Sequence, residues 1–275
     1  MDVNIAPAQR AIYTRAMASL GEAGVPYLVS GALAVHHYTG LWRHTKDLDL
    51  FLCPEDRDAA LLALANAGYR VEITAGHWLA KAFMDDVLVD LISGTGNWLA
   101  PVDESWFENA DEAEILGLPC GVIGITELIW AKAYVAGRER FDGADIAHLI
   151  RRGRERIDWQ RLLERFADHW ELLLLYLNYF RFVYPEQRDA IPRRVVEELL
   201  GRLQADVRQP AAPEIAFRGP LLDRYAYLVD MEEWGEPDPR VEIAQERNLP
   251  PHEVTIQRAA DQRRMTEKRV QPSTP

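Results

Sequence analysis

The chain contains little cysteine and no long apolar run. Its two cysteines, Cys53 and Cys120, fit a reducing compartment and lack metal-binding spacing, so we expect neither a disulfide framework nor a cysteine-ligated metal. No run of about 18 uncharged apolar residues is present, so we expect no membrane span and no membrane partner. The first residues, Met1 to Asn4, lack the basic start and apolar stretch of a secretory signal. Together these absences predict a cytoplasmic protein.

Lysine is also scarce, and acidic residues outnumber basic ones, 43 to 31. The formal net charge is −12, and lysine occurs only four times among the 31 basic residues. This balance argues against a protein that coats nucleic acid. A negative net charge is still compatible with a nucleotide substrate, because bound divalent ions invert the local electrostatic field. With 48% apolar and 27% charged residues, the 275-residue chain has an ordinary globular composition and room for one large or two modest domains.

Residues 1–125 combine helical and strand patterns. Helical spacing closed by glycine predicts helices over residues 8–23, 31–38 and 54–67. Short apolar runs predict strands over residues 25–30, 46–53, 69–73, 77–84 and 87–93, and Asp85-Asp86 suits a hairpin turn between the last two. This region is predicted to be an α/β fold, a small mixed sheet with flanking helices.

The pattern after residue 125 is mainly helical. Thr126 is a suitable N-cap for the first helix of this region. An apolar stripe at helical spacing runs through 158–182, and the theme repeats over 191–203. We therefore predict a helical domain over 126–235. Residues 236–275 are rich in proline and charge, so we expect a tail with little core of its own.

Two aspartates alternate with leucines in the predicted strand 46–53. Side chains at i and i+2 of a strand share a face, so Asp47 and Asp49 point the same way while Leu48 and Leu50 face the core. Adjacent carboxylates repel each other unless a cation lies between them. Mg²⁺ takes one or two protein carboxylates and completes its shell with water and substrate phosphates. The pair therefore indicates nucleotide chemistry.

Two further features match this interpretation. Ser30 and Gly31 lie between a predicted strand and a predicted helix, where the glycine lets the backbone approach a phosphate and the hydroxyl can donate to one. Asp90 lies in the otherwise apolar run 87–92, where an unpaired carboxylate would be costly, so a ligand role is favoured.

Ser30-Gly31, Asp47-x-Asp49 and Asp90 together resemble the signature of the nucleotidyltransferase superfamily of DNA polymerase β. The longer run from Arg43 to Leu50 looks like the Arg-x-Ser/Thr-x-Asp-x-Asp form of its toxin-type, abortive-infection members. A looser similarity to the Lys…Arg…Asp-x-x-Asp helix pair of that group involves Lys132, Arg138, Arg140, Asp142 and Asp145. The resemblance covers about the first half of the chain.

This resemblance implies transfer of an NMP from an NTP to a hydroxyl of a protein, of an RNA end such as that of tRNA, or of a small molecule. It implies two Mg²⁺ (or Mn²⁺) ions, about 3.5–4 Å apart, held by Asp47, Asp49 and Asp90. Asp90 would also help to deprotonate the hydroxyl. The nucleotide-binding residues that it implies are Ser30, Gly31, Arg43, Lys46 and Lys132.

Other interpretations of these residues stay open. Asp-x-Asp alone is common on solvated strand faces, Arg43, Lys46 and Lys132 suit a surface role as well, and Asp142 and Asp145 suit helix capping or salt bridges. The alternative function is a catalytically silent nucleotide-binding or protein-binding module, such as one half of a toxin–antitoxin pair with a cognate antitoxin. A third possible function is that of an interaction scaffold, in which the helical half binds the partner. The sequence leaves the acceptor, the NTP and the oligomeric state undetermined.

Overall fold

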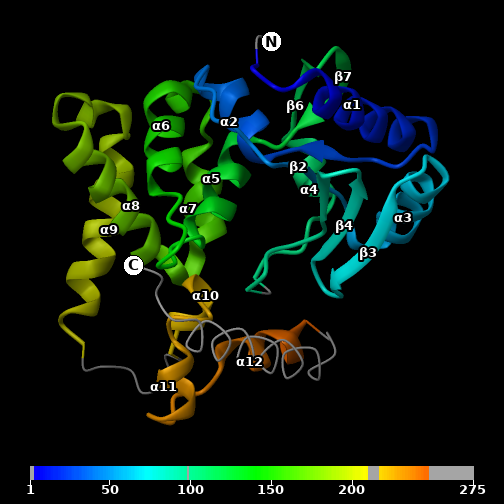
Figure 1. The fold of residues 1–275 in the computed structure, drawn as a ribbon. Coiled ribbons are helices and arrows are strands. Elements are labelled where there is room, and N and C mark those ends of the chain that lie inside the picture. The colour runs from blue at the N-terminus through cyan, green and yellow to red at the C-terminus, as the bar shows by residue number, and fades with distance from the viewer. Residues whose placement is uncertain (1–2, 98, 210–216, 248–275) are drawn as a thin grey trace, which may run out of the picture.

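The structure, a computed structural model, describes residues 3–97, 99–209 and 217–247. In these residues seven strands form one mixed sheet, in the order β3-β4-β5-β2-β1-β7-β6. Figure 1 shows α5 to α9 beside this sheet, with α10, α11 and α12 below them. The predicted fold class, a mixed sheet with flanking helices followed by a mainly helical region, is confirmed.

The element boundaries follow. The strands are β1 (Leu28–Val29), β2 (Asp47–Phe51), β3 (Arg70–Ala75), β4 (Leu79–Met84), β5 (Val87–Ile92), β6 (Asp111–Ile115) and β7 (Leu118–Val122). The α-helices are α1 (Pro7–Glu22), α2 (Gly31–Thr39), α3 (Arg57–Asn66), α4 (Glu104–Glu108), α5 (Ile125–Ala133), α6 (Gly143–Gly153), α7 (Trp159–Phe166), α8 (Trp170–Val183), α9 (Arg193–Asp206), α10 (Gly219–Leu222), α11 (Leu228–Glu232) and α12 (Pro239–Glu246). Short 3₁₀ helices cover Pro54–Asp56, Arg154–Arg156, Ala167–His169 and Pro185–Ala190. None of these helices has both the length and the apolar character that a membrane crossing needs.

One face of the sheet at β2 packs into the hydrophobic core, and the other faces α4 and the helical region. Leu48 and Leu50 of β2 point into the hydrophobic core and are buried almost completely. Phe51 points to the opposite face, where it stacks on Trp106 of α4 with ring centroids 5.5 Å apart. By strand alternation Asp49 lies on the same face as Phe51. The carboxylate therefore faces the side of the sheet that the helical region covers.

Most of the predicted elements are present, with shifted ends. The five strands predicted in the first half are β1 to β5, and Asp85, with φ of 51°, lies in the turn that joins β4 to β5. Strands β6 and β7 are not among the predictions, because their side chains alternate only weakly between buried and exposed. Strand β7 pairs in parallel with β1 and so extends the sheet beyond the size expected.

Two details of the helical half differ from the predictions. The N-cap of α5 is Gly124, and Thr126 lies inside the helix, where its hydroxyl accepts the N–H of Asp158 at 3.1 Å. The apolar stripe 158–182 is divided between α7 and α8, because Ala167 adopts a positive φ of 39° and interrupts the helix. Both differences arise from tertiary contacts and backbone bends that apolar spacing does not report.

The segment predicted to be a tail contains a packed helix. Within α12, Arg240 and Ala244 are fully buried. The guanidinium of Arg240 pairs with Asp238 at 2.8 Å, so its charge is neutralised inside the protein. The expectation of little core is therefore wrong for Pro239–Glu246, and residues 248–275 lie outside the described residues.

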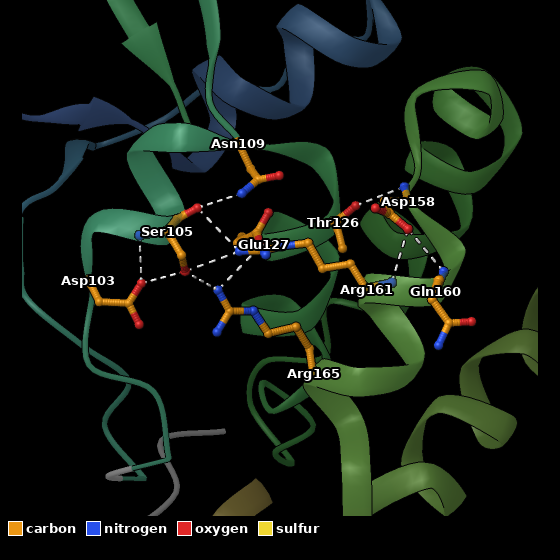
Figure 2. A network of polar contacts seen from close by, with 9 residues as sticks. All are labelled: Asp103, Ser105, Asn109, Thr126, Glu127, Asp158, Gln160, Arg161 and Arg165. Atoms are coloured by element: carbon orange, nitrogen blue, oxygen red, sulfur yellow. Dashed lines mark hydrogen bonds and ion pairs between the residues drawn. The ribbon is translucent and has the colours of Figure 1, made fainter.

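A buried polar network joins α4, α5 and α7 (Figure 2). Glu127 of α5 is completely buried and pairs with Arg161 and Arg165, two residues of α7. Arg161 also donates to the backbone oxygen of Ser105 at 3.2 Å, and Asp158 caps α7 by accepting the N–H of Arg161 at 3.0 Å. Because both arginines pair with one buried carboxylate, removal of that carboxylate would leave two cations without their partner, and the network fixes the three helices to one another.

Candidate active site

Strands β2 and β5 bring three carboxylates to one face of the sheet. The two strands are parallel neighbours, and Asp49 lies directly opposite Asp90. Residues opposite each other on neighbouring strands point to the same face, and Asp47 shares that face with Asp49 by alternation. The structure thus brings together the three aspartates that the sequence singles out.

The cluster of aspartates carries more negative charge than its surroundings neutralise. Burial, together with the neighbouring charges of Asp47 and Asp90, raises the pKa of the Asp49 carboxyl to about 7. Arg140 and Lys132 lie near enough to oppose this effect without cancelling it. Burial also raises the pKa of Asp90. A cation bound at this face would therefore be stabilised.

Lys81 of β4 is a site residue that the sequence analysis misses. Its ammonium binds the Asp90 carboxylate, with Nζ and Oδ1 2.6 Å apart, and it lowers the pKa of Asp90 against the effect of burial. The sequence contains the information that pairs Lys81 with Asp90. A two-residue turn at Asp85-Asp86 pairs Met84 with Val87, and this register places Lys81 opposite Asp90.

The turn from β1 into α2 lies against Asp49. The backbone N–H of Ser30 donates to the backbone oxygen of Asp49 at 2.9 Å. Gly31 has φ of +58°, and a Cβ on it would lie 1.8 Å from Oδ2 of Asp49, so only glycine fits. The Ser30 hydroxyl makes no capping bond, and the first N–H groups of α2 have no partner within the helix. The turn can therefore donate hydrogen bonds to an anion beside the carboxylates.

The predicted basic residues are mostly engaged in ion pairs. Lys132 is buried and binds Asp142 at 2.8 Å and Asp145 at 2.9 Å. The half-exposed side chain of Arg43 also pairs with Asp145. Arg140 donates two hydrogen bonds to Asp142, at 3.0 and 3.1 Å. Asp142 and Asp145 therefore act as salt-bridge partners, one of the two interpretations left open by the sequence.

This ion-pair cluster borders the three aspartates. Burial alone would raise the pKa of Asp142, but Lys132 and Arg140 hold it below its usual value. Both cations also act on Asp49. Lys46 differs from them, because its side chain is exposed and has no ion pair within the described residues. It remains available to a ligand.

A cavity of about 1080 Å³ begins at the carboxylate face. Ser30, Gly31 and Asp49 form one end of it. Its other walls come from β2, β5, the loop after β5, helix α5 with the loop that follows, and residues 220–226. The volume is that of a large small-molecule site. The predicted phosphate turn and Asp49 thus line the same cavity.

The donor set fits a hard divalent cation. No group of three or more His, Cys, Asp or Glu side chains in the described part of the chain is arranged to hold one metal ion. Mg²⁺ requires less, because one or two carboxylates suffice when water and substrate phosphates complete its shell. Asp47 and Asp49 provide two carboxylates. Burial, and after it the charges of Asp47 and Asp90, raise the pKa of Asp49, so its ionised form is one that a bound cation would stabilise. Asp90 is bound by Lys81.

The mixed sheet, the Ser-Gly turn and the paired carboxylates define a nucleotidyltransferase. Over residues 9–171, more than half of its length, the sequence matches the family described as a nucleotidyl transferase of unknown function (DUF2204). The chain belongs to this family. The predicted superfamily and enzyme class are therefore confirmed. A search of curated protein sequences finds no match.

Several solved structures are similar to this chain. The antibiotic-resistance factor ANT(2'')-Ia is 18% identical, with 67% of this chain and 97% of that chain covered and a TM-score of 0.42. The lincosamide antibiotic adenylyltransferase LnuA is 15% identical, with 53% and 97% covered and a TM-score of 0.38. An antigenic nucleotidyltransferase-like protein from Paracoccidioides brasiliensis is 15% identical, with 68% and 93% covered and a TM-score of 0.41. These TM-scores are too low to support an inference about the substrate of this chain.

Proposed function

We propose that this chain transfers a nucleoside monophosphate from an NTP to a hydroxyl acceptor, with Asp47, Asp49 and Asp90 as catalytic residues. The observation that carries the proposal is the pairing of Asp49 with Asp90 across β2 and β5, beside the Ser30-Gly31 turn. A strand face built only for folding would not place Asp49 beside two further carboxylates that Lys81 and the neighbouring cations compensate only in part. Family membership supports the reaction class.

In the proposed reaction the acceptor oxygen forms a bond to the α-phosphorus, and the bond from that phosphorus to pyrophosphate breaks. The proton of the acceptor hydroxyl passes to Asp90, whose raised pKa makes it a stronger base than an ordinary aspartate. Mg²⁺ or Mn²⁺ held by Asp47 and Asp49 would supply stabilisation of the charge on the phosphates. The Ser30 hydroxyl and the first N–H groups of α2 would bind phosphate oxygens.

The basic residues contribute to nucleotide binding in this proposal. Lys46 is free to contact a phosphate directly. Arg43 and Lys132 share Asp145 as a partner, so one of them can turn to a phosphate while the other neutralises this carboxylate. We therefore keep all three as nucleotide-binding residues. Location in the cytoplasm and a cognate antitoxin remain predictions from the sequence.

The test is transfer of label from an α-phosphate-labelled NTP in the presence of Mg²⁺ or Mn²⁺. Asp49→Asn keeps the shape of the side chain and removes its charge, so we expect label transfer to be lost. Asp58→Asn is the matched control, because Asp58 lies on α3 with an exposed side chain. Label transfer that persists in Asp49→Asn would contradict the assigned chemistry.

NTP binding distinguishes the alternative function from the proposed one. An NTP with Mg²⁺ stabilises the folded protein against heat if it binds the native state. Stabilisation without transfer to any acceptor would indicate the catalytically silent module. We expect both stabilisation and transfer in the wild-type protein, and the four NTPs compared in this way identify the preferred base.

A further inference from the structure

The cavity continues from the carboxylates over an apolar floor. Phe51 and Ile92 are paired in register two residues beyond Asp49 and Asp90, and both line the cavity. Alternation places all four side chains on one face of the sheet. Trp78 adds an aromatic wall. An apolar surface thus lies directly beside the proposed site of transfer.

Residues 220–226 close the far side of this space. Asn97, in the loop after β5, donates from Nδ2 to the backbone oxygen of Leu221 at 3.1 Å. The backbone N–H of Arg138, in the loop after α5, donates to Oδ2 of Asp223 at 2.9 Å. The segment is therefore attached to both halves of the molecule, in the region where Figure 1 shows α10 below α5 and α7.

The strand order places the proposed site of the leaving phosphates and the proposed site of the attacking acceptor on opposite sides of β2. The Ser30-Gly31 turn follows β1, on one side of β2, whereas Asp90 lies on β5, on the other side. The attacking and leaving oxygens of phosphoryl transfer are roughly in line. If the turn binds the leaving phosphates, the acceptor approaches from the side of β5. That side leads along Ile92 and the loop after β5 to Leu221.

We infer that residues 220–226, with Phe51, Trp78 and Ile92, form an acceptor subsite for a small hydroxyl-bearing molecule with an apolar face. The inference rests on the proposed function. The enclosing segment leaves room for a small molecule beside the nucleotide, because the whole cavity measures about 1080 Å³. An RNA acceptor is disfavoured, since the chain carries a net charge of −12 and RNA binding depends on cationic contacts to phosphates.

The first experiment identifies the size class of the acceptor. Wild-type protein is incubated with the four α-labelled NTPs, Mg²⁺ and a cell extract divided by ultrafiltration into small molecules and retained macromolecules. We expect label on a compound of the small-molecule filtrate. Label on retained RNA or protein would overturn the inference and leave the proposed function standing. Absence of label from both fractions would contradict the proposed function, and with it the inference.

The second experiment locates the subsite. Ala226 is exposed and lines the cavity, so Ala226→Trp fills the space near residues 220–226 without disturbing the core. Transfer to the filtrate compound should fall by at least about tenfold, as expected when a pocket loses the room that its ligand needs. Ala205→Trp, also at an exposed alanine but on α9, should change nothing.

NTP binding to Ala226→Trp, measured by thermal stabilisation with Mg²⁺, separates the acceptor from the nucleotide. We expect NTP binding equal to that of the wild type. Weakened NTP binding in this variant would show that the segment contacts the nucleotide and would overturn the inference. Unchanged transfer in this variant would overturn it as well.

Discussion

Two groups of acidic side chains in this molecule contrast with each other. Glu127 is completely buried and pairs with Arg161 and Arg165, as Figure 2 shows. Asp49 instead has Asp47 and Asp90 beside it, and burial with these two charges raises its pKa to about 7. Glu127 has two cations bound to it, whereas Asp49 has two carboxylates beside it, and Lys81, Lys132 and Arg140 compensate this group only in part.

The contrast separates a structural carboxylate from one suited to bind a ligand. Arginine beside a buried glutamate repays the cost of removing both charges from water, and the result is a fixed contact between helices. Carboxylates that face one another destabilise the empty protein and gain free energy when a cation arrives. Unbalanced charge near a cavity is therefore the better indicator of function. Four predictions test this contrast.

The largest effect is expected at Asp49. Asp49→Asn should lower the rate of nucleotidyl transfer by at least about 1000-fold, the scale of removing a group that acts in the transition state. Its stability toward urea, measured without divalent cations, should equal or exceed that of the wild type, because a repelling charge is gone. A clear loss of stability would show that Asp49 has a structural role like that of Glu127.

Glu127→Gln should show the opposite pattern. It leaves Arg161 and Arg165 without their buried counter-charge, so we expect the free energy of unfolding to fall by about 3 kcal/mol. Transfer by the folded fraction should be unchanged. Glu197→Gln removes an exposed partner of Arg193 and should cost less than about 0.5 kcal/mol. Equal losses in the two variants, measured by urea unfolding, would contradict the prediction.

Gly31→Ala tests the close approach of the turn to Asp49. The added Cβ would lie 1.8 Å from Oδ2 of Asp49, so the carboxylate must move. A displacement of about 1 Å near the chemistry costs about 100-fold in rate. Gly24→Ala is a matched control, because Gly24 also has positive φ, of 68°, but has no neighbour within 4 Å of an added Cβ. Gly24→Ala should lower the free energy of unfolding, because alanine is strained at positive φ, and it should leave the rate of transfer unchanged.

The smallest effect concerns pH. The folded-state pKa of Asp49 is about 7 against an ordinary value of 3.8, so the folded protein binds this proton more tightly than the unfolded chain does. The resulting stability is present below 3.8 and is lost as pH rises through about 7. Thermal unfolding in EDTA should show this decline, and Mg²⁺ should restore stability above the folded-state pKa. Asp49→Asn should remove this contribution to the pH dependence.

The parts of the fold that could be predicted are those with a local signal. Alternation of Asp and Leu in 47–50 placed the carboxylates on one face, and the glycine after Ser30 marked the start of α2. The hairpin turn at Asp85-Asp86 likewise determines the register that pairs Lys81 with Asp90. These signals lie within a few residues of the features that they determine.

Features that depend on distant residues could not be predicted in this way. Strand β7 joins the sheet through β1, nearly 100 residues earlier in the chain, and its own pattern is weak. The ion pairs that Lys132 and Arg43 both form with Asp145 are a second feature of this kind. Ion pairs between separate elements depend on the distance at which packing holds them, and no spacing along the chain reports it.

The sequence by itself determined the strand that carries Asp47 and Asp49 and the Ser30-Gly31 turn, because backbone periodicity and glycine conformation are local properties. The class of enzyme followed from the resemblance of these motifs to a known superfamily. Only the tertiary structure decided that Asp90 lies opposite Asp49, that Lys132 pairs with Asp142 and Asp145, and that residues 220–226 line the cavity. These contacts depend on the folded molecule, since electrostatic and packing energies depend on distances through space.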